Sequence, residues 1–201
     1  MLTQAITPHV DPNPHSSDQS TKQQNKRALR RKIRKLRRSL SPAEQRNASR
    51  RLATQLQRSK LLLRHRFIAL YLGSDGELNP EPLIKQLWRQ KKQVYLPVIH
   101  PFYCNQLYFC RIQPKTRLIK NKFGIAEPDL KHTHRLPKQF LSLTLMPLVA
   151  FDSKGNRMGM GGGFYDRSFA FKANKKNQSR QIKPKLVGIA HSFQEQPHLS
   201  V

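Results

Sequence analysis

The chain has 201 residues, 37% of them hydrophobic, which allows one sizeable core and argues against two full domains. Its 38 Lys and Arg against 11 Asp and Glu give a formal net charge of +27, which predicts attraction to polyanions such as nucleic acid. The spacing of the two cysteines indicates neither a disulfide framework nor a zinc site. Because the sequence shows no signal peptide and no apolar run of membrane length, we expect a soluble, cytoplasmic protein that does not enter membranes.

The first 25 residues are rich in Pro, Ser, Thr, Asn and Gln, so we expect residues 1–25 to form a disordered tail and residues 26–201 a single domain. From Lys26, apolar residues recur at helical spacing with cations between them. This pattern predicts a helix with one apolar and one basic face, the apolar face being Leu29, Ile33, Leu36 and Leu40. Ser41-Pro42-Ala43-Glu44 is a capping-box pattern and predicts the start of a second helix.

The next segments alternate between strand and helix patterns. The apolar run 67–72 predicts a buried strand, Asn79-Pro80 the start of a helix, and residues 93–98 a strand parallel to the first. Further strands are predicted at 107–112, 141–151 and 186–190, with a solvent loop at 172–185. This order predicts an α/β fold, a three-layer α/β/α sandwich with a mostly parallel sheet.

The segment after residues 141–151 contains four glycines within five positions, Gly159 and Gly161 to Gly163. Glycines permit positive φ and a close approach to a phosphate, and backbone amides with a following helix N-terminus supply an anion nest. The segment is not a Rossmann fingerprint, because its third glycine would fall at Phe164, and it lacks the Gly-Lys-Ser/Thr end of a P-loop. The pattern therefore indicates a phosphate site of another kind.

Several of the few acidic residues lie at predicted strand ends or beside turns, where open α/β sheets place ligand sites: Asp75, Glu77, Glu127, Asp152 and Asp166. Carboxylates beside a phosphate nest predict a divalent metal, because magnesium holds nucleotide phosphates through one or two carboxylates. The alternative is that these acids only offset the surrounding positive charge. The residue pattern alone leaves both interpretations open.

The run Arg157 to Asp166 resembles the Arg-x-Gly-x-Gly-x-Gly-Tyr-Tyr-Asp signature of the 5-formyltetrahydrofolate cyclo-ligase family, also called methenyltetrahydrofolate synthetases. Three segments are similar to the family in the same order: Lys26-Arg27-Ala28-Leu29-Arg30, Gly76-Glu77 and Glu127-Pro128. The resemblance spans residues 26 to 194. It implies a cytosolic ligase of one-carbon folate metabolism that uses ATP and Mg²⁺ to convert 5-formyltetrahydrofolate to 5,10-methenyltetrahydrofolate.

The resemblance also implies roles for individual residues. ATP would be held by the opening helix and the glycine loop, with Arg157 and Lys26 as the catalytic cations: Lys26, Arg27, Ala28, Leu29, Arg30, Arg157, Met158, Gly159, Met160, Gly161, Gly162, Gly163, Phe164 and Tyr165. Asp166 would bind magnesium. The folate would be contacted by Leu72, Glu77, Met160, Gly161, Gly162, Gly163 and Phe164.

The sequence departs from the family pattern after Gln194, where that pattern continues through a Leu-Pro step, an aspartate-bearing segment and a last strand. The resemblance therefore implies that the C-terminal part of the family fold is missing, and we expect the fold to survive better than catalysis. Two alternatives stay open, an inactive relative that binds nucleotide or folate and a basic nucleic-acid-binding protein. The second is disfavoured because helix 26–38 has no aromatic residues between its cations. We expect a monomer.

Overall fold

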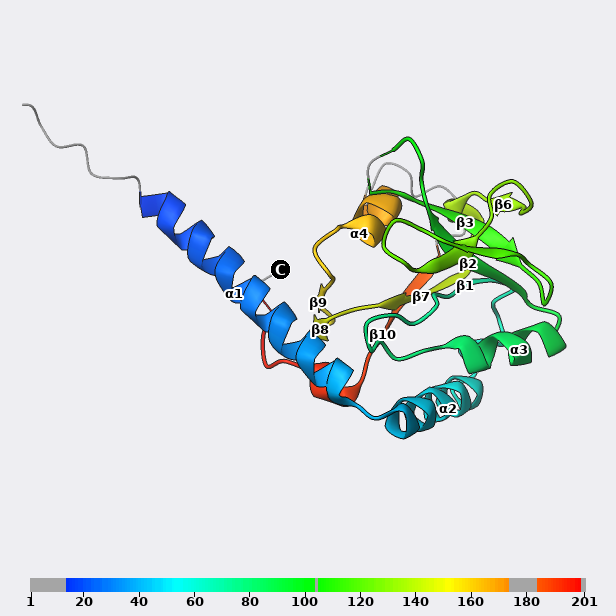
Figure 1. Cartoon of the computed structure of the whole chain (residues 1–201), viewed down its shortest axis with the longest axis horizontal. Coiled ribbons are helices and arrows are strands. Elements are labelled where there is room, and N and C mark those ends of the chain that lie inside the picture. The colour runs from blue at the N-terminus through cyan, green and yellow to red at the C-terminus, as the bar shows by residue number, and fades with distance from the viewer. Residues whose placement is uncertain (1–13, 104, 174–183, 200–201) are drawn as a thin grey trace, which may run out of the picture.

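The computed structural model describes residues 14–103, 105–173 and 184–199, and Figure 1 shows a sheet with helices on both of its faces. The main sheet has six strands in the order β10-β7-β1-β2-β3-β6. Its strands are β1 (Phe67–Ala69), β2 (Gln93–Ile99), β3 (Leu107–Ile112), β6 (Arg135–Leu136), β7 (Leu143–Pro147) and β10 (Lys185–Ile189). The pairs β10–β7, β7–β1 and β1–β2 are parallel, and β2–β3 and β3–β6 are antiparallel. The predicted α/β class and mostly parallel sheet are confirmed.

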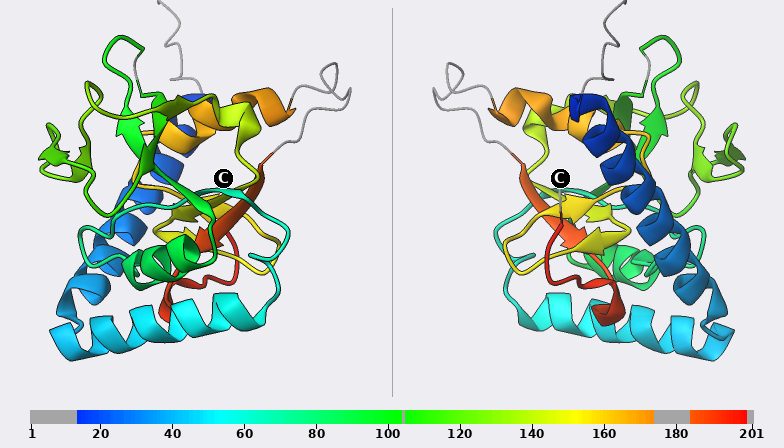
Figure 2. Two further views of the ribbon diagram at one scale, coloured as in Figure 1. Left: turned by 90° about the vertical axis from the view of Figure 1, so that its right-hand side faces the viewer. Right: turned by 90° about the vertical axis from the view of Figure 1, so that its left-hand side faces the viewer.

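Two helices cover one face of the sheet and a short helix covers the other (Figures 1 and 2). Helices α2 (Pro42–Arg58) and α3 (Glu81–Arg89) pack on one face, where their leucines meet the alternate side chains of β1, β2 and β7. On the opposite face, α4 (Phe164–Phe169) and the 3₁₀ turn Ala170–Ala173 bring aromatic rings against Tyr95 and Phe109. The sheet is therefore the middle layer of three, as the sequence predicted.

Helix α1 (Pro14–Ser39) is longer than the sequence predicted, because it begins at Pro14 and not at Lys26. Residues 14–25 are therefore helical where the sequence predicted part of a disordered tail, and residues 1–13 lie outside the described residues. Between Pro14 and Ser39 there is no further proline and no glycine, so an established helix extends through this polar segment at little cost. The capping box at the start of α2 is present, with Ser41 and Glu44 bonding to each other's backbone amides.

The predicted strand 141–151 is divided in two. Strand β7 ends at Pro147, and a two-residue strand β8 (Ala150–Phe151) pairs with β9 (Arg157–Met158) to form a separate small hairpin that leads into the glycine loop. Pro147 lacks the amide hydrogen that would continue the ladder, which accounts for the break. A second small hairpin consists of β4 (Leu118–Lys120) and β5 (Ala126–Pro128). Most of the predicted loop 172–185 lies outside the described residues.

The last described residues return to α1. After β10, the 3₁₀ turn Ser192–Gln194 buries the Gln194 amide, which donates to the carbonyls of Leu148 and Val149. Leu199 then joins a small apolar cluster with Ala150 and Met158, and Leu29 of α1 packs against it. None of the helices in the described part of the chain is both long and apolar enough to cross a membrane.

Candidate functional site

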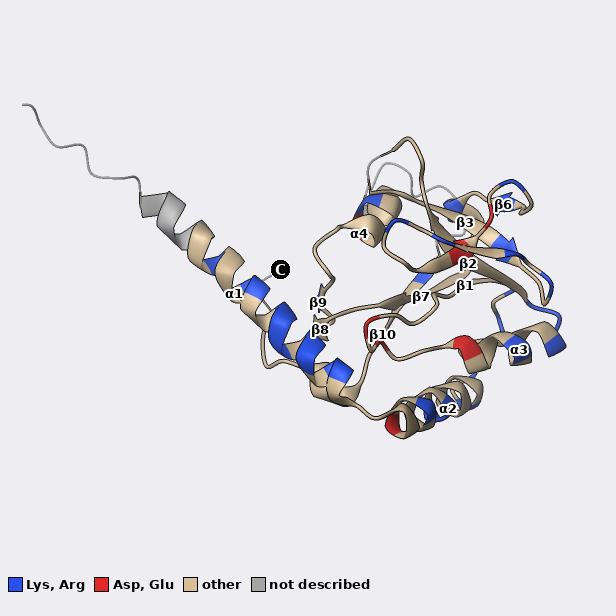
Figure 3. Ribbon diagram, in the orientation of Figure 1, with Lys and Arg blue, Asp and Glu red and all other residues tan. Residues whose placement is uncertain are grey.

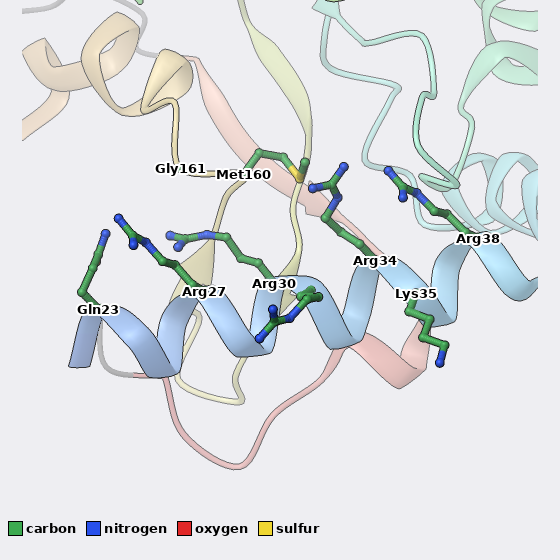
Figure 4. Close-up of a pocket in the computed structure, with 9 residues that line it drawn as sticks. Gln23, Arg27, Arg30, Arg34, Lys35, Arg38, Met160 and Gly161 are labelled. Atoms are coloured by element: carbon green, nitrogen blue, oxygen red, sulfur yellow. The ribbon is translucent and has the colours of Figure 1, made fainter. Parts of the chain in front are cut away.

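Helix α1 lies directly beside the glycine loop. The Nε atom of Arg30 donates to the carbonyl of Gly159 at 2.9 Å, although the two residues are far apart in the sequence. In Figure 4, Arg27, Arg30 and Arg34 extend from α1 toward the loop that carries Met160 and Gly161. A groove of about 480 Å³ runs along α1 beside Met160 and Gly161, and apart from these two residues and Gln23 its lining is entirely cationic: Arg27, Arg30, Arg31, Arg34, Lys35 and Arg38.

The backbone of the glycine loop turns where it meets α1. Gly161 has φ of +101°, a conformation that side-chain-bearing residues rarely adopt, and a β-carbon added there would lie 3.8 Å from Cζ of Arg30. Helix α4, which follows, has only six residues. Because the helix dipole is weak at that length, an anion at the loop would be held by the loop amides and by the α1 cations.

A second turn, residues 73–77 after β1, packs against the other end of α1. Gly76 has φ of +72°, and a β-carbon there would lie 2.7 Å from the carbonyl oxygen of Arg37. The Gln45 side chain joins the two segments by donating to the carbonyls of Arg37 and Gly76 at 3.1 and 3.2 Å. Glycine at this position therefore permits the close approach of turn and helix.

Asp75 in this turn binds three arginines of α1. Arg34 and Arg37 lie 2.7 and 2.8 Å from its Oδ2 atom, and Arg38 contacts Oδ1. Burial would raise the pKa of Asp75, but the hydrogen bonds from Arg34, Arg38 and Arg37 together hold it below its ordinary value. Asp75 is thus an anion that fixes the turn to the helix.

Glu77 is the more buried carboxylate. Its Oε2 atom accepts from the amide and hydroxyl of Ser74 at 3.2 and 3.3 Å, and its Oε1 atom lies 3.8 Å from Nη1 of the fully buried Arg37. Burial raises the pKa of Glu77, while Ser74 and Arg37 oppose that rise. Burial, and then the negative charge of Glu77, also raises the pKa of Tyr71 and of Tyr165 in α4, which places Glu77 near the start of α4.

Arg157 and Asp166, from the two ends of the signature, form an ion pair with each other. The Asp166 side chain is 68% exposed and that of Arg157 is 24% exposed, so the pair borders solvent. The predicted magnesium ligand therefore has a cationic partner in this structure. Because pairs in solvent are weak, an entering ligand can replace either member.

The structure brings the predicted nucleotide residues of α1 and of the loop together, and it gives some of their side chains other contacts. Leu29 and Met158 pack in the same apolar cluster, and Leu72 packs against the main core. Lys26 does not line the cationic groove, whereas Arg27 and Arg30 do. Phe164 meets the exposed ring of Phe123 edge-on, with the ring centroids 6.1 Å apart.

The other predicted acids do not join the site. Asp152 accepts from the amides of Lys154, Asn156 and Leu199, so it orders its own loop and the C-terminal segment. Glu127 accepts from the Ile99 amide and the Asn121 side chain. Within residues 14–103, 105–173 and 184–199, no three His, Cys, Asp or Glu side chains gather in a group that could hold a metal ion.

Sequence reasoning missed Arg34, Arg37 and Arg38. It assigned Leu36 to the apolar face of α1, but Leu36 is 42% exposed and the neighbouring Arg37 is fully buried. The signal was available, because Arg37 lies four residues after Ile33 and three before Leu40, which is the spacing of one helix face. A cation inside that stripe implied a buried acidic partner.

Comparison with known proteins gives a consistent result. A model of the 5-formyltetrahydrofolate cyclo-ligase family matches residues 22–201. The chain is 41% identical to the 5-formyltetrahydrofolate cyclo-ligase of Escherichia coli over 158 residues, covering 79% of this chain and 83% of that protein. It is 47% identical to the Haemophilus influenzae protein of that name over 132 residues, covering 66% and 67%. The structure of Aquifex aeolicus 5,10-methenyltetrahydrofolate synthetase superposes with a TM-score of 0.71 at 30% identity, covering 88% of this chain and 82% of that one. By sequence and by fold, the chain belongs to the 5-formyltetrahydrofolate cyclo-ligase family.

Proposed function

We propose that the chain converts 5-formyltetrahydrofolate to 5,10-methenyltetrahydrofolate, with ATP as the phosphoryl donor and Mg²⁺ as its counter-ion. The observation that carries this proposal is the contact of α1 with two segments at once. Arg30 bonds to the glycine loop, and Arg37 approaches Glu77. A polyanion in the cationic groove would therefore lie near a carboxylate suited to polar groups of a pterin.

The cationic groove fits the triphosphate of a nucleotide. Phosphoryl transfer requires little covalent chemistry from a protein, so positive charge and positioning supply most of the catalysis. Arg27, Arg30 and Arg157 would neutralise phosphate oxygens, and the amides around Gly161 would bind them directly. Magnesium, when bound with ATP, offsets phosphate charge, and a single carboxylate is a sufficient protein ligand because Mg²⁺ keeps several waters. Asp166 is the carboxylate in the signature and would hold it.

The chemical need for ATP lies in the formyl group. A formamide carbon resists attack by a neighbouring nitrogen, and hydroxide is a poor leaving group. Transfer of the γ-phosphoryl group to the formyl oxygen forms a P–O bond there and releases ADP. N10 of the folate then bonds to the formyl carbon and releases its proton to solvent, and the formyl oxygen departs as phosphate. The protein's part is to hold the two substrates in line, and no covalent protein intermediate is required.

Glu77 is the residue we assign to the folate. An ionised carboxylate accepts hydrogen bonds from the N–H groups of a pterin, and such charge-assisted bonds are the stronger kind. Met160 lines the groove and Phe164 is the first residue of α4, and the two side chains would separate nucleotide from folate. We also propose that the protein is a cytoplasmic monomer. The buried thiol of Cys110, which forms no disulfide, is in keeping with a reducing compartment.

A specific observation favours polyanion binding as a second property. Residues 20–66 contain 17 Lys and Arg and a single acid, Glu44, and Figure 3 shows Lys and Arg along α1 and α2. Three exposed arginines of α2 line a shallow depression: Arg50, Arg51 and Arg58. No aromatic residue of α2 is available to stack on bases, so binding would depend on phosphate charge alone.

The test is turnover followed by calorimetry. With ATP, Mg²⁺ and 5-formyltetrahydrofolate, methenyl-folate absorbance should rise, and no rise without ATP is expected. Glu77→Ala should lose folate binding by about a hundredfold and keep ATP binding, since one charge-assisted contact is removed. The matched control is Glu81→Ala, an exposed carboxylate on α3.

Calorimetry separates the alternatives. An inactive relative would bind ATP or folate without turnover. A nucleic-acid-binding protein would bind only a random duplex, with an affinity that falls steeply as salt rises. Either outcome without ATP-dependent turnover would refute the proposed enzyme.

A further inference from the structure

Arg37 links the two halves of the proposed site. Its Nη2 atom lies 2.8 Å from Asp75 and 4.0 Å from the sulfur of Met160 in the glycine loop. Its Nη1 atom lies 3.8 Å from Glu77 and donates a long hydrogen bond of 3.4 Å to the carbonyl of Leu148, just after β7. One side chain thus contacts the turn after β1, the chain after β7 and the glycine loop.

The burial of this arginine needs a reason. Taking a guanidinium out of water is costly, and an apolar side chain of similar volume would fill the space with equal or greater stability. Its Nε atom is also buried without a hydrogen-bond partner among the described residues. Asp75 does not require Arg37, because Arg34 and Arg38 already bind it. What Arg37 adds is its approach to Glu77.

Arg37 is the ion-pair partner of Glu77 in the described part of the chain. The remaining contacts of Glu77 are with Ser74, in its own turn, and these hold only Oε2. The Oε1 atom would therefore be placed by Arg37. Because Arg37 also touches Met160, the distance between the carboxylate and the glycine loop depends on the same guanidinium.

We propose that Arg37 is a positioning residue for the folate site: it sets the Glu77 carboxylate at a fixed place relative to the glycine loop while touching neither substrate. The proposal rests on the proposed function, in which Glu77 binds the folate. Arg37 is buried on all sides, so its influence passes through Glu77 and Met160.

Arg37 also affects the charge of Glu77. The groups that face Glu77 are Asp75 in the same turn, Arg34 and Arg37 from α1, Tyr71 after β1 and Tyr165 from α4. Burial raises the pKa of Glu77, and the charge of Arg37 opposes that rise. Without Arg37 the pKa should rise further. On acidification the Glu77 carboxylate would then become protonated at a higher pH than in wild type, and it would no longer accept hydrogen bonds from the pterin.

The decisive experiment compares Arg37→Met with Arg38→Met. Both remove a guanidinium that binds Asp75, but only Arg37 approaches Glu77. In Arg37→Met, KM for 5-formyltetrahydrofolate should rise about tenfold, as expected for loss of one positioned contact, and KM for ATP should change less than about twofold. The acid limb of the kcat/KM profile should move to higher pH, and so should the titration of the Glu77 side-chain carbon followed by ¹³C NMR. Arg38 also lines the cationic groove, so the comparison rests on the folate quantities alone: Arg38→Met should keep the folate KM and the Glu77 titration of wild type.

Several results would overturn the inference. One is an Arg37→Met protein with the wild-type folate KM and the wild-type Glu77 titration, and another is an equal effect of Arg38→Met. If Arg37→Met does not fold, Arg37→Lys replaces it. That variant keeps the charge, so Glu77 should titrate as in wild type while the folate KM rises, and an unchanged KM would count against positioning. An inactive wild-type protein would contradict the proposed function instead, and the Glu77 titration would still decide whether Arg37 controls that carboxylate.

Discussion

Two acidic sites belong to the proposed functional site, and they differ in their surroundings. The Asp75 and Glu77 side chains are 16% and 10% exposed and lie against three arginines of the helix. Asp166 is 68% exposed and forms an ion pair with Arg157. Buried ion pairs are costly to rearrange, whereas pairs in water exchange readily. The first site is therefore suited to holding the fold and the folate in place, and the second to releasing its partners when a nucleotide enters.

The largest expected effect is that of Asp75→Asn. The substitution leaves the buried Arg37 without its closest carboxylate, and removal of one member of a buried pair is strongly destabilising. Because Asp75 is partly exposed and Glu77 remains nearby, we expect a loss of about 3 kcal/mol in the free energy of unfolding at pH 7. Urea denaturation of both proteins measures the difference. A loss no larger than that of an ordinary surface substitution would mean that Asp75 does not join turn and helix.

The same variant should show a defined pH dependence. In the folded protein the pKa of Asp75 lies below its ordinary value of 3.8, so ionisation of this carboxyl group stabilises the folded state relative to the unfolded chain. That contribution is complete above the ordinary pKa and is lost as the pH falls through the lower folded value. The difference in the free energy of unfolding between wild type and Asp75→Asn should thus be largest near neutral pH, and it should shrink as the pH falls below 3.8. A gap that widens on acidification would contradict the assignment.

Gly76→Ala tests the contact between turn and helix through sterics. A methyl group at φ of +72° would lie 2.7 Å from the Arg37 carbonyl, so the substitution adds a clash to the backbone strain. Gly155→Ala is the matched control, because Gly155 has φ of +83° with no atom within 4 Å of an added β-carbon. We expect losses of about 2 kcal/mol for Gly76→Ala and about 1 kcal/mol for Gly155→Ala. Equal losses in thermal denaturation would show that α1 and the turn are not in close contact.

Much of the fold could be predicted because its signals are local. The capping box at Ser41, the parallel pair β1–β2 and the strand 107–112 follow from patterns within a few residues, and all three are present. The strand 141–151 was predicted too long, because an apolar run does not show where Pro147 interrupts pairing. Similarly, composition does not reveal that a polar segment continues an existing helix, as residues 14–25 do.

The candidate site was predicted in part. The glycine loop, Glu77 and the cations of α1 could be named from the sequence, since each belongs to a recognisable motif. Their partners could not, because Arg34, Arg37 and Arg38 look like the other cations of a basic helix until the turn at Asp75 is placed against them. Tertiary packing decides which cation of such a helix is buried. The sequence indicates it only through the position of Arg37, four residues after Ile33 and three before Leu40.

The smallest effect on stability is expected for Asp166→Asn. An exposed ion pair contributes little, so the free energy of unfolding should change by less than about 0.5 kcal/mol. Affinity for ATP in the presence of Mg²⁺ should nevertheless fall about tenfold, because a carboxylate binds the metal better than an amide does. Without Mg²⁺ the variant should bind ATP at least as well as wild type, since Arg157 is freed and a negative charge near the phosphates is removed. Calorimetry with and without Mg²⁺ measures both affinities, with the exposed Glu195→Gln as the control for loss of charge. If Asp166→Asn instead destabilised the fold as much as Asp75→Asn, the contrast between a buried scaffold and an exchangeable exposed pair would be wrong.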